Sequence, residues 1–115
     1  KERVAFGQPI AQFQAIQFML ADMATHIDAA RLLVYRAADA FDRGLPATVQ
    51  AAMAKVFATD MAMRVTTDAV QVLGGYGYVK EYNVERYMRN AKVMQIFEGT
   101  NQIQRIVIGR SIVGR

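Results

Sequence analysis

The chain has 115 residues, of which 53% are hydrophobic, so it can bury one real core but scarcely two. It contains no cysteine, which excludes disulfides, thiolate chemistry and cysteine-ligated metal sites and fits a reducing compartment, the cytoplasm or the mitochondrial matrix. Its charge of +4 comes from scattered basic residues and no apolar run approaches ~20 residues, so nucleic-acid binding and membrane insertion are both disfavoured.

A long amphipathic helix is predicted from residue 11 to residue 43. Apolar residues recur there in steps of three and four, the spacing of one helix face. Gly44, followed by Pro46, provides the expected end. Other apolar side chains widen this face, so we expect the helix to contact more than one neighbour. The residues of this predicted apolar stripe are Phe13, Ile16, Leu20, Met23, Ile27, Ala30, Val34, Ala37 and Phe41.

A second long helix is predicted from residues 46–48 to the glycine pair 74–75. Its apolar face is interrupted by two polar residues, Asp60 and Thr67. The segment GGYGY that follows (74–78) is interpreted as an interhelical turn, because no G-x-G-x-x-G motif follows a strand here.

Two short helices complete the prediction, one at 84–95 and one that begins with Thr100 or Asn101 as its N-cap. Strand-type alternation is absent from the sequence. Long and short helices joined by short connections are typical of an all-α antiparallel helical bundle with crossing angles of ~20°.

The segment IFEGTNQIQ (96–104) places one carboxylate, Glu98, just ahead of the last predicted helix. An acid there has an ordinary explanation, because the helix dipole stabilises it by ~0.3–1 kcal/mol. The alternative is that Glu98 is a catalytic base. Spacing alone favours the first interpretation.

No metal site is predicted. His26 is the single histidine, and only Asp22 and Asp28 lie near it in the sequence. We expect His26 at the surface or in an interface.

Three ordered blocks change the balance: ERVAFGQPIAQFQAIQFMLADMATHIDAARLL (2–33), AAMAKVFATDMAMRVTTDAVQVLGGYGY (51–78) and VERYMRNAKVMQIFEGTNQIQR (84–105). Together they resemble the C-terminal domain of acyl-CoA dehydrogenases over essentially the whole chain. The resemblance implies that residues 1–115 are the C-terminal helical domain of a longer chain. The first helix of the family's bundle would then lie upstream of Lys1, and the bundle here would lack it.

The resemblance implies an FAD-dependent enzyme that converts a fatty-acyl-CoA thioester to trans-2-enoyl-CoA. In most of the family the Glu of a Y/F-E-G-T motif removes the α-proton while the β-hydrogen leaves as hydride to the flavin N5; Glu98 occupies that place. Gly99 would leave room for the substrate thioester. Electrons would pass onward to an electron-transfer flavoprotein.

The same resemblance implies two groups of FAD-binding residues. Thr100 and Gln102, with Asn101 between them, are expected to contact FAD. The QVLGG block (71–75) and the N-terminal residues are similar to segments that meet the FAD of a neighbouring subunit, where an arginine suits the pyrophosphate. Each residue could instead cap a helix or form an ion pair. The expected residues are Arg3, Phe6, Gln14, Gln71, Val72, Leu73, Gly74, Gly75, Thr100, Asn101 and Gln102.

Two further expectations concern the isolated chain. Without the N-terminal and middle domains of the family, it should bind FAD feebly and have little activity. A helix face left uncovered should drive assembly into a dimer or tetramer. The alternative function is a non-catalytic helical oligomerisation module.

Overall fold

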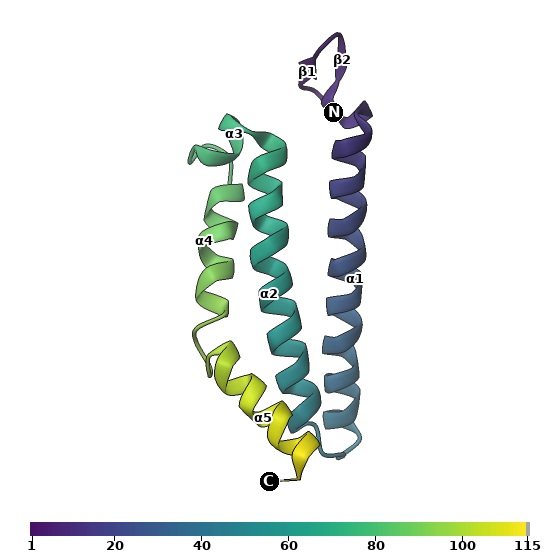
Figure 1. Cartoon of the computed structure of the whole chain (residues 1–115), viewed down its shortest axis with the longest axis vertical. Coiled ribbons are helices and arrows are strands. Elements are labelled where there is room, and N and C mark those ends of the chain that lie inside the picture. Colours follow the sequence, from purple (N-terminus) through teal and green to yellow (C-terminus); the bar gives the residue numbers. More distant parts are fainter. Residues whose placement is uncertain (115) are drawn as a thin grey trace.

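Two long antiparallel helices, α1 (Gln14–Asp42) and α2 (Thr48–Leu73), run along the length of the molecule (Figure 1). The short helix α3 (Gly75–Tyr78) follows α2, and α4 (Val84–Met94) then returns beside α2. The computed structural model describes residues 1–114, which measure 58 × 25 × 23 Å. The predicted all-α antiparallel bundle is therefore confirmed.

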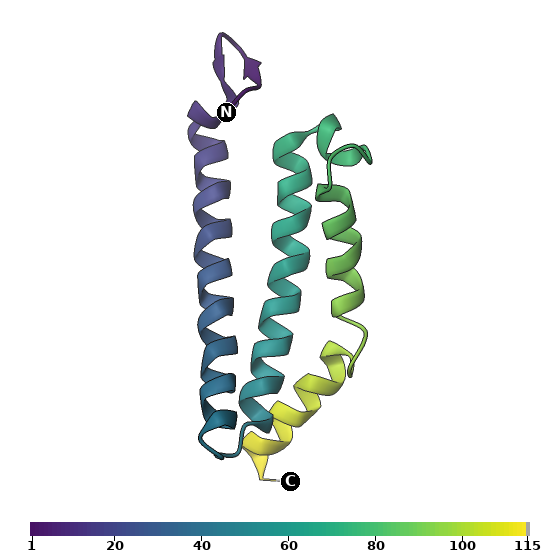
Figure 2. The same ribbon diagram turned by 180° about the vertical axis from the view of Figure 1, so that it is seen from behind.

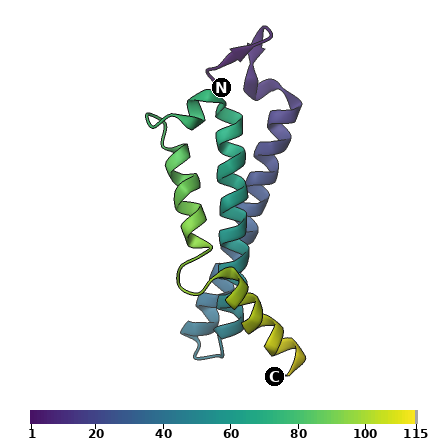
Figure 3. The ribbon, with the colours of Figure 1, turned by 60° about the vertical axis from the view of Figure 1, so that its left-hand side comes forward.

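Helix α2 lies at the centre of this bundle. It packs against α1 on one side and against α4 and α5 (Asn101–Val113) on the other, as the view from behind shows (Figure 2). The turned view shows α5 crossing the first half of α2 at an angle, after the bend that separates it from α4 (Figure 3). This bend carries Glu98.

The end of α1 follows its sequence signal. Gly44 adopts a positive φ of 67°, its N–H donates to the carbonyl of Phe41, and the N–H of Leu45 donates to the carbonyl of Ala40. These two bonds satisfy carbonyls that the helix would otherwise leave without partners. A 3-10 turn, η1 (Ile10–Gln12), precedes the helix, which therefore starts slightly later than predicted.

The structure also contains a small β-hairpin that no pattern in the sequence predicted. Strands β1 (Val4–Ala5) and β2 (Gln8–Pro9) pair antiparallel around Phe6 and Gly7, whose φ values are 52° and 82°. A two-residue turn with both residues at positive φ joins tight hairpins, and Gly favours its second position. Strands of two residues are too short to show alternation, so the only sequence signal was the Gly after Phe6.

The GGYGY segment was also more ordered than predicted, because residues 75–78 form the helical turn α3. Gly77 is buried there, and a Cβ at this position would lie 2.6 Å from the carbonyl oxygen of Val70. A glycine therefore allows α3 to pack directly onto the backbone of α2.

The predicted apolar stripe of α1 is divided in the structure. Met23 and Ala30 of the stripe are buried, together with Ala40, which the prediction did not include. From Leu20 onward, the larger stripe residues at seven-residue spacing are at least one-third exposed. These residues, with their exposed fractions, are Leu20 (45%), Ile27 (38%), Val34 (45%) and Phe41 (77%).

Candidate functional site

Glu98 lies in the bend between α4 and α5, in a backbone conformation that few residues other than glycine adopt. Its φ is 53°, and that of Gly99 is 84°, so both residues are in the left-handed region. Such a conformation is uncommon for a residue other than glycine and is found where the surroundings hold it in place. Thr100, one of the two predicted candidates, is the N-cap of α5, and its hydroxyl accepts from the N–H of Ile103 at 3.3 Å. The Glu98 side chain is exposed at the bend.

Two side chains hold the backbone of this turn. Gln104 Nε2 donates to the carbonyl of Glu98 at 3.1 Å, and Lys55 Nζ donates to the carbonyl of Gly99 at 2.8 Å. The Gln104 contact comes from α5, whereas Lys55 reaches across from α2. A Cβ on residue 99 would lie 2.8 Å from Gln104 Nε2. The positive φ favours glycine at position 99, and a side chain there would also displace the Gln104 amide from its present position.

Asn101 connects the turn to the interior. It is only 3% exposed, and its Oδ1 accepts from Lys55 Nζ at 2.7 Å. Its Nδ2 donates to Thr59 Oγ1 at 2.8 Å and to Asp60 Oδ1 at 2.7 Å. The amide that was predicted to lie near FAD thus has its oxygen and nitrogen bonded inside the bundle. A role for Asn101 in cofactor binding stays a prediction.

Asp60 joins both ends of the turn. Gln95 Nε2, just before the turn, donates to Asp60 Oδ1 at 2.7 Å, and Arg105 forms an ion pair with Asp60 Oδ2. Burial raises the pKa of Asp60, but hydrogen bonds from Arg105, Gln95 and Asn101 together with the charge of Arg105 outweigh it, so the pKa is lowered. We call the set formed by Lys55, Thr59, Asp60, Gln95, Asn101 and Arg105 the Asp60 network.

Sequence reasoning missed most of this network. The one signal was Asp60, a charged residue that interrupts the apolar face of α2. Its partners lie 35 to 45 residues later in the chain, so no local pattern identifies them. Within residues 1–114, no buried polar side-chain atom lacks a hydrogen-bond partner.

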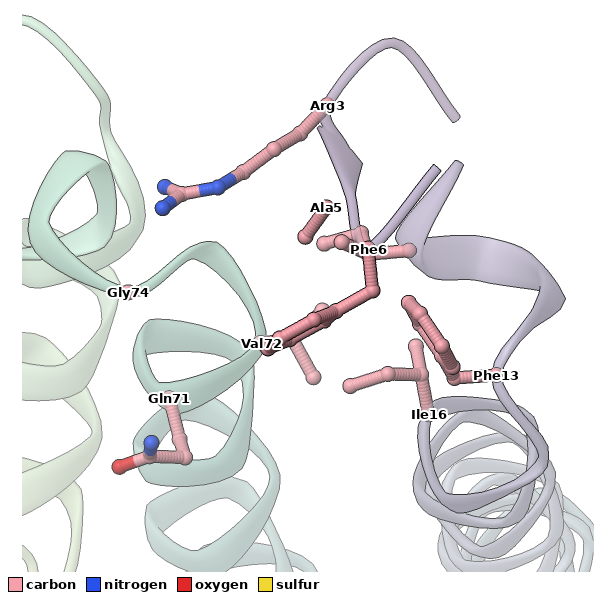
Figure 4. A pocket seen from close by; sticks show the side chains of 9 residues that line it. Arg3, Ala5, Phe6, Phe13, Ile16, Gln71, Val72 and Gly74 are labelled. Carbon is pink, nitrogen blue, oxygen red and sulfur yellow. The ribbon is translucent and has the colours of Figure 1, made fainter. Parts of the chain in front are cut away.

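The second group of predicted residues surrounds a pocket between the hairpin and the last turn of α2 (Figure 4). The guanidinium of Arg3 extends from the hairpin toward Gly74, and Phe6 stacks edge-on against Phe13 with ring centroids 6.2 Å apart. The cavity has a volume of about 390 Å³ and mostly apolar walls. Its lining residues are Arg3, Ala5, Phe6, Ile10, Phe13, Ile16, Gln71, Val72 and Gly74.

The structure brings together Arg3, Phe6, Gln71, Val72 and Gly74 of the predicted cofactor residues. Leu73 lines an adjoining hollow with Tyr76 and Tyr82, while Gln14 and Gly75 line neither cavity described here.

The two predicted FAD-binding groups lie at different places along α2. Lys55, which contacts the Glu98 turn, and Gln71, which lines the pocket, are 16 residues apart on this helix, about 24 Å at the standard rise. The structure therefore assembles two sites rather than one. Within one chain, the pocket does not adjoin Glu98.

Two other features limit the chemistry. Within residues 1–114, no three His, Asp or Glu side chains lie close enough to hold a metal ion, and His26 Nδ1 donates to the carbonyl of Asp22 at 2.7 Å. In the same part of the chain, none of the helices combines the length and the apolar character that crossing a membrane requires.

Comparison with known proteins gives a consistent result. The family described as "Acyl-CoA dehydrogenase, C-terminal domain" matches residues 1–113. An acyl-CoA dehydrogenase of Bacillus subtilis is 58% identical over 114 residues, which are 99% of this chain and 30% of that protein.

Two solved structures are similar to this one. Butyryl-CoA dehydrogenase from Megasphaera elsdenii is 57% identical with a TM-score of 0.97, over 98% of this chain and 30% of that one. A chain in a structure described as the electron transferring flavoprotein of Acidaminococcus fermentans is 60% identical with a TM-score of 0.97. The match covers 99% of this chain and 30% of that one. The chain thus spans about 30% of the length of the proteins it matches.

Proposed function

The chain belongs to the acyl-CoA dehydrogenase family as a C-terminal domain, and on this premise we propose that it is part of an enzyme that oxidises fatty-acyl-CoA thioesters to trans-2-enoyl-CoA. Members of the family are FAD-dependent flavoproteins. The observation that carries the proposal is Glu98, an exposed carboxylate on a backbone turn held from α2 and from α5. A fixed turn that presents a carboxylate outward suits a base that must meet a substrate held by other parts of the enzyme.

In this mechanism the Glu98 carboxylate takes the α-proton, and the C–H bond electrons remain to form the new double bond as the β-hydrogen leaves as hydride. FAD, when bound, supplies the acceptor for that hydride. Gly99 adds no side chain beside the carboxylate, so the thioester can approach the turn. Thr100, whose hydroxyl caps α5, and Gln102, which is exposed on the first turn of α5, follow Glu98 closely in the chain, and we propose that both contact the flavin.

The pocket at the hairpin fits the other half of the cofactor by its chemistry. Apolar walls suit an adenine ring, and the Arg3 guanidinium suits pyrophosphate oxygens. Gly74 has a φ of 59° and faces Arg3, since a Cβ there would lie 3.8 Å from Arg3 Nη1. The separation of this pocket from Glu98 supports the expectation that it serves the FAD of a neighbouring subunit.

The decisive experiment is Glu98→Gln in the full-length enzyme that contains this domain. Loss of the base should lower kcat by at least about 10²-fold while FAD stays bound. The matched control is Glu81→Gln, an exposed acid in the loop before α4, which should leave kcat unchanged. Unchanged turnover in Glu98→Gln, in an enzyme that retains FAD, would instead favour a non-catalytic helical module or a base elsewhere.

Self-association is the second part of the proposal. Helix α1 carries a line of exposed apolar residues from Leu20 to Phe41. Such a face favours burial against another protein surface over contact with water. We propose that the isolated chain forms a dimer or tetramer through this face and that it binds FAD feebly without turning over acyl-CoA. Sedimentation that shows only monomer across a wide concentration range would contradict the assembly.

The electron acceptor is proposed from similarity alone. The match to a chain in a structure described as an electron transferring flavoprotein supports such a flavoprotein as the partner that reoxidises the enzyme. Acyl-CoA would be the substrate.

A further inference from the structure

We propose that Lys55 on α2 is a positioning residue for Glu98, which it holds in place through the backbone of the turn. This inference rests on the proposed role of Glu98 as the base. Lys55 touches no atom of the Glu98 side chain in the contacts described above; it acts on the next peptide group. Lys55 lies 43 positions before Glu98 in the sequence, outside the motif that surrounds Glu98.

Lys55 makes two hydrogen bonds at the turn. Its ammonium donates to the carbonyl of Gly99 at 2.8 Å and to Oδ1 of Asn101 at 2.7 Å. These acceptors lie on either side of Thr100, so one point on α2 fixes both the end of the left-handed turn and the beginning of α5. Because left-handed φ at Glu98 is sparsely populated by itself, the turn depends on such contacts.

The Lys55 contact is itself held in a fixed geometry. Its partner Asn101 is buried, and the amide is oriented by bonds to Thr59 and Asp60 on the same helix as Lys55. Charge-assisted hydrogen bonds of this kind are shorter and stronger than neutral ones. Gln104 holds the preceding carbonyl, that of Glu98. Two successive peptide groups, those carrying the carbonyls of Glu98 and Gly99, are thus fixed independently.

The alternative is that the Asp60 network only attaches α5 to α2. The structure offers a matched control for that alternative, because the ion pair between Arg105 and Asp60 connects the same two helices. The Arg105 contact lies beyond the turn, on the second turn of α5, and it meets Asp60 rather than a backbone atom of residues 98–99. A purely structural network predicts similar effects from the loss of Arg105 and of Lys55.

The test measures kcat, KM, FAD content and thermal unfolding for three variants of the full-length enzyme: Lys55→Met, Lys55→Arg and Arg105→Met. A displaced turn should lower kcat about 10- to 100-fold in Lys55→Met, since a misplacement of ~1 Å can cost about 10²-fold. KM and FAD content should change less than about threefold. Lys55→Arg keeps a donor and should recover most of the rate, and Arg105→Met should lower kcat less than about threefold.

Two further variants keep the inference falsifiable. If Lys55→Met does not fold, Gln104→Met removes the other carbonyl contact without entering the Asp60 network, and it should give the same selective fall in kcat. Lys55→Met added to Glu98→Gln should cost less than about twofold, because a residue that acts through Glu98 has nothing left to position.

The outcomes separate the two proposals. Equal losses in Lys55→Met and Arg105→Met, or a loss of kcat that follows FAD content and melting temperature, would overturn the positioning role and leave Glu98 as the base. Full turnover in Glu98→Gln would overturn the proposed function itself, whatever Lys55 does.

Discussion

In its first half, α2 meets the Glu98 turn through charged and amide side chains, whereas at its last turn it faces the hairpin across an apolar pocket. Asn101 in the first region is 3% exposed, and Phe6 in the second is 96% exposed. In the Glu98 turn, Lys55 and Gln104 of this chain hold the backbone carbonyls. The pocket region, by contrast, has mostly apolar walls. The Glu98 turn and the hairpin pocket are therefore built differently, one from a hydrogen-bonded polar network and the other from mostly apolar walls.

The sharpest way to break this contrast is Gly99→Ala. The substituted residue would have to keep φ near 84° and would place its Cβ 2.8 Å from Gln104 Nε2, so either the turn or the Gln104 contact must move. We expect a loss of about 1–3 kcal/mol in the free energy of unfolding and a fall in kcat. Gly109→Ala is the matched control, because a Cβ at Gly109, inside α5, meets nothing within 4 Å. That variant should gain about 0.5–1 kcal/mol. Equal melting temperatures for the two variants would contradict the tight turn.

An intermediate effect is expected from acid. The folded-state pKa of Asp60 lies below its ordinary value of 3.8, so the unfolded chain takes up this proton first as the pH falls. The contribution of Asp60 to stability is therefore complete above the ordinary value and is lost as the pH falls through the folded-state pKa. Chemical unfolding at a series of pH values between about 6 and about 3 measures this loss. The free energy of unfolding should fall less steeply with falling pH for Asp60→Asn than for the unaltered chain.

The control for this experiment is Asp39→Asn, which removes an exposed carboxylate paired with Arg43. An exposed pair contributes little to stability. If both variants flatten the acid slope equally, the Asp60 network does not explain the acid sensitivity of the fold.

The smallest effect on stability is expected at the hairpin. Phe6→Ala removes an almost fully exposed ring and should change the free energy of unfolding by less than about 0.5 kcal/mol. If the pocket receives the cofactor of a neighbouring subunit, the same variant should nevertheless retain less FAD in the full-length enzyme. Calorimetry and the flavin-to-protein absorbance ratio measure the two quantities. A large fall in melting temperature with unchanged FAD would reverse the interpretation of this region.

Much of the helical framework could be predicted because its signals are local. Gly44 ends α1 at the predicted residue, and Thr100 caps α5 as one of the two candidates. The hairpin was missed because its strands have two residues each. The left-handed conformation of Glu98 was missed as well, since nothing about a glutamate favours positive φ.

Of the candidate site, only the residues that belong to the family's motifs could be predicted from the sequence. Resemblance to the family singled out Glu98 and the pocket residues, and five of the latter do line one cavity. Lys55, Gln95 and Arg105 were not identified, because each acts through a partner that is remote in the sequence or only becomes a neighbour when α5 folds back onto α2. Periodicity describes which face of a helix is apolar, and it carries no information about such pairs.

The sequence by itself determined where the helices end, that they form a bundle, and which family the chain belongs to. Helix caps, glycines and the spacing of apolar residues are local signals that act within one or two helical turns. Only the tertiary structure decided that Ala30 is buried while Val34, four residues on, stays 45% exposed. It also decided that Lys55 reaches the carbonyl of Gly99. Both depend on how α2 packs against its neighbours, and burial and long-range hydrogen bonds exist only once those surfaces meet.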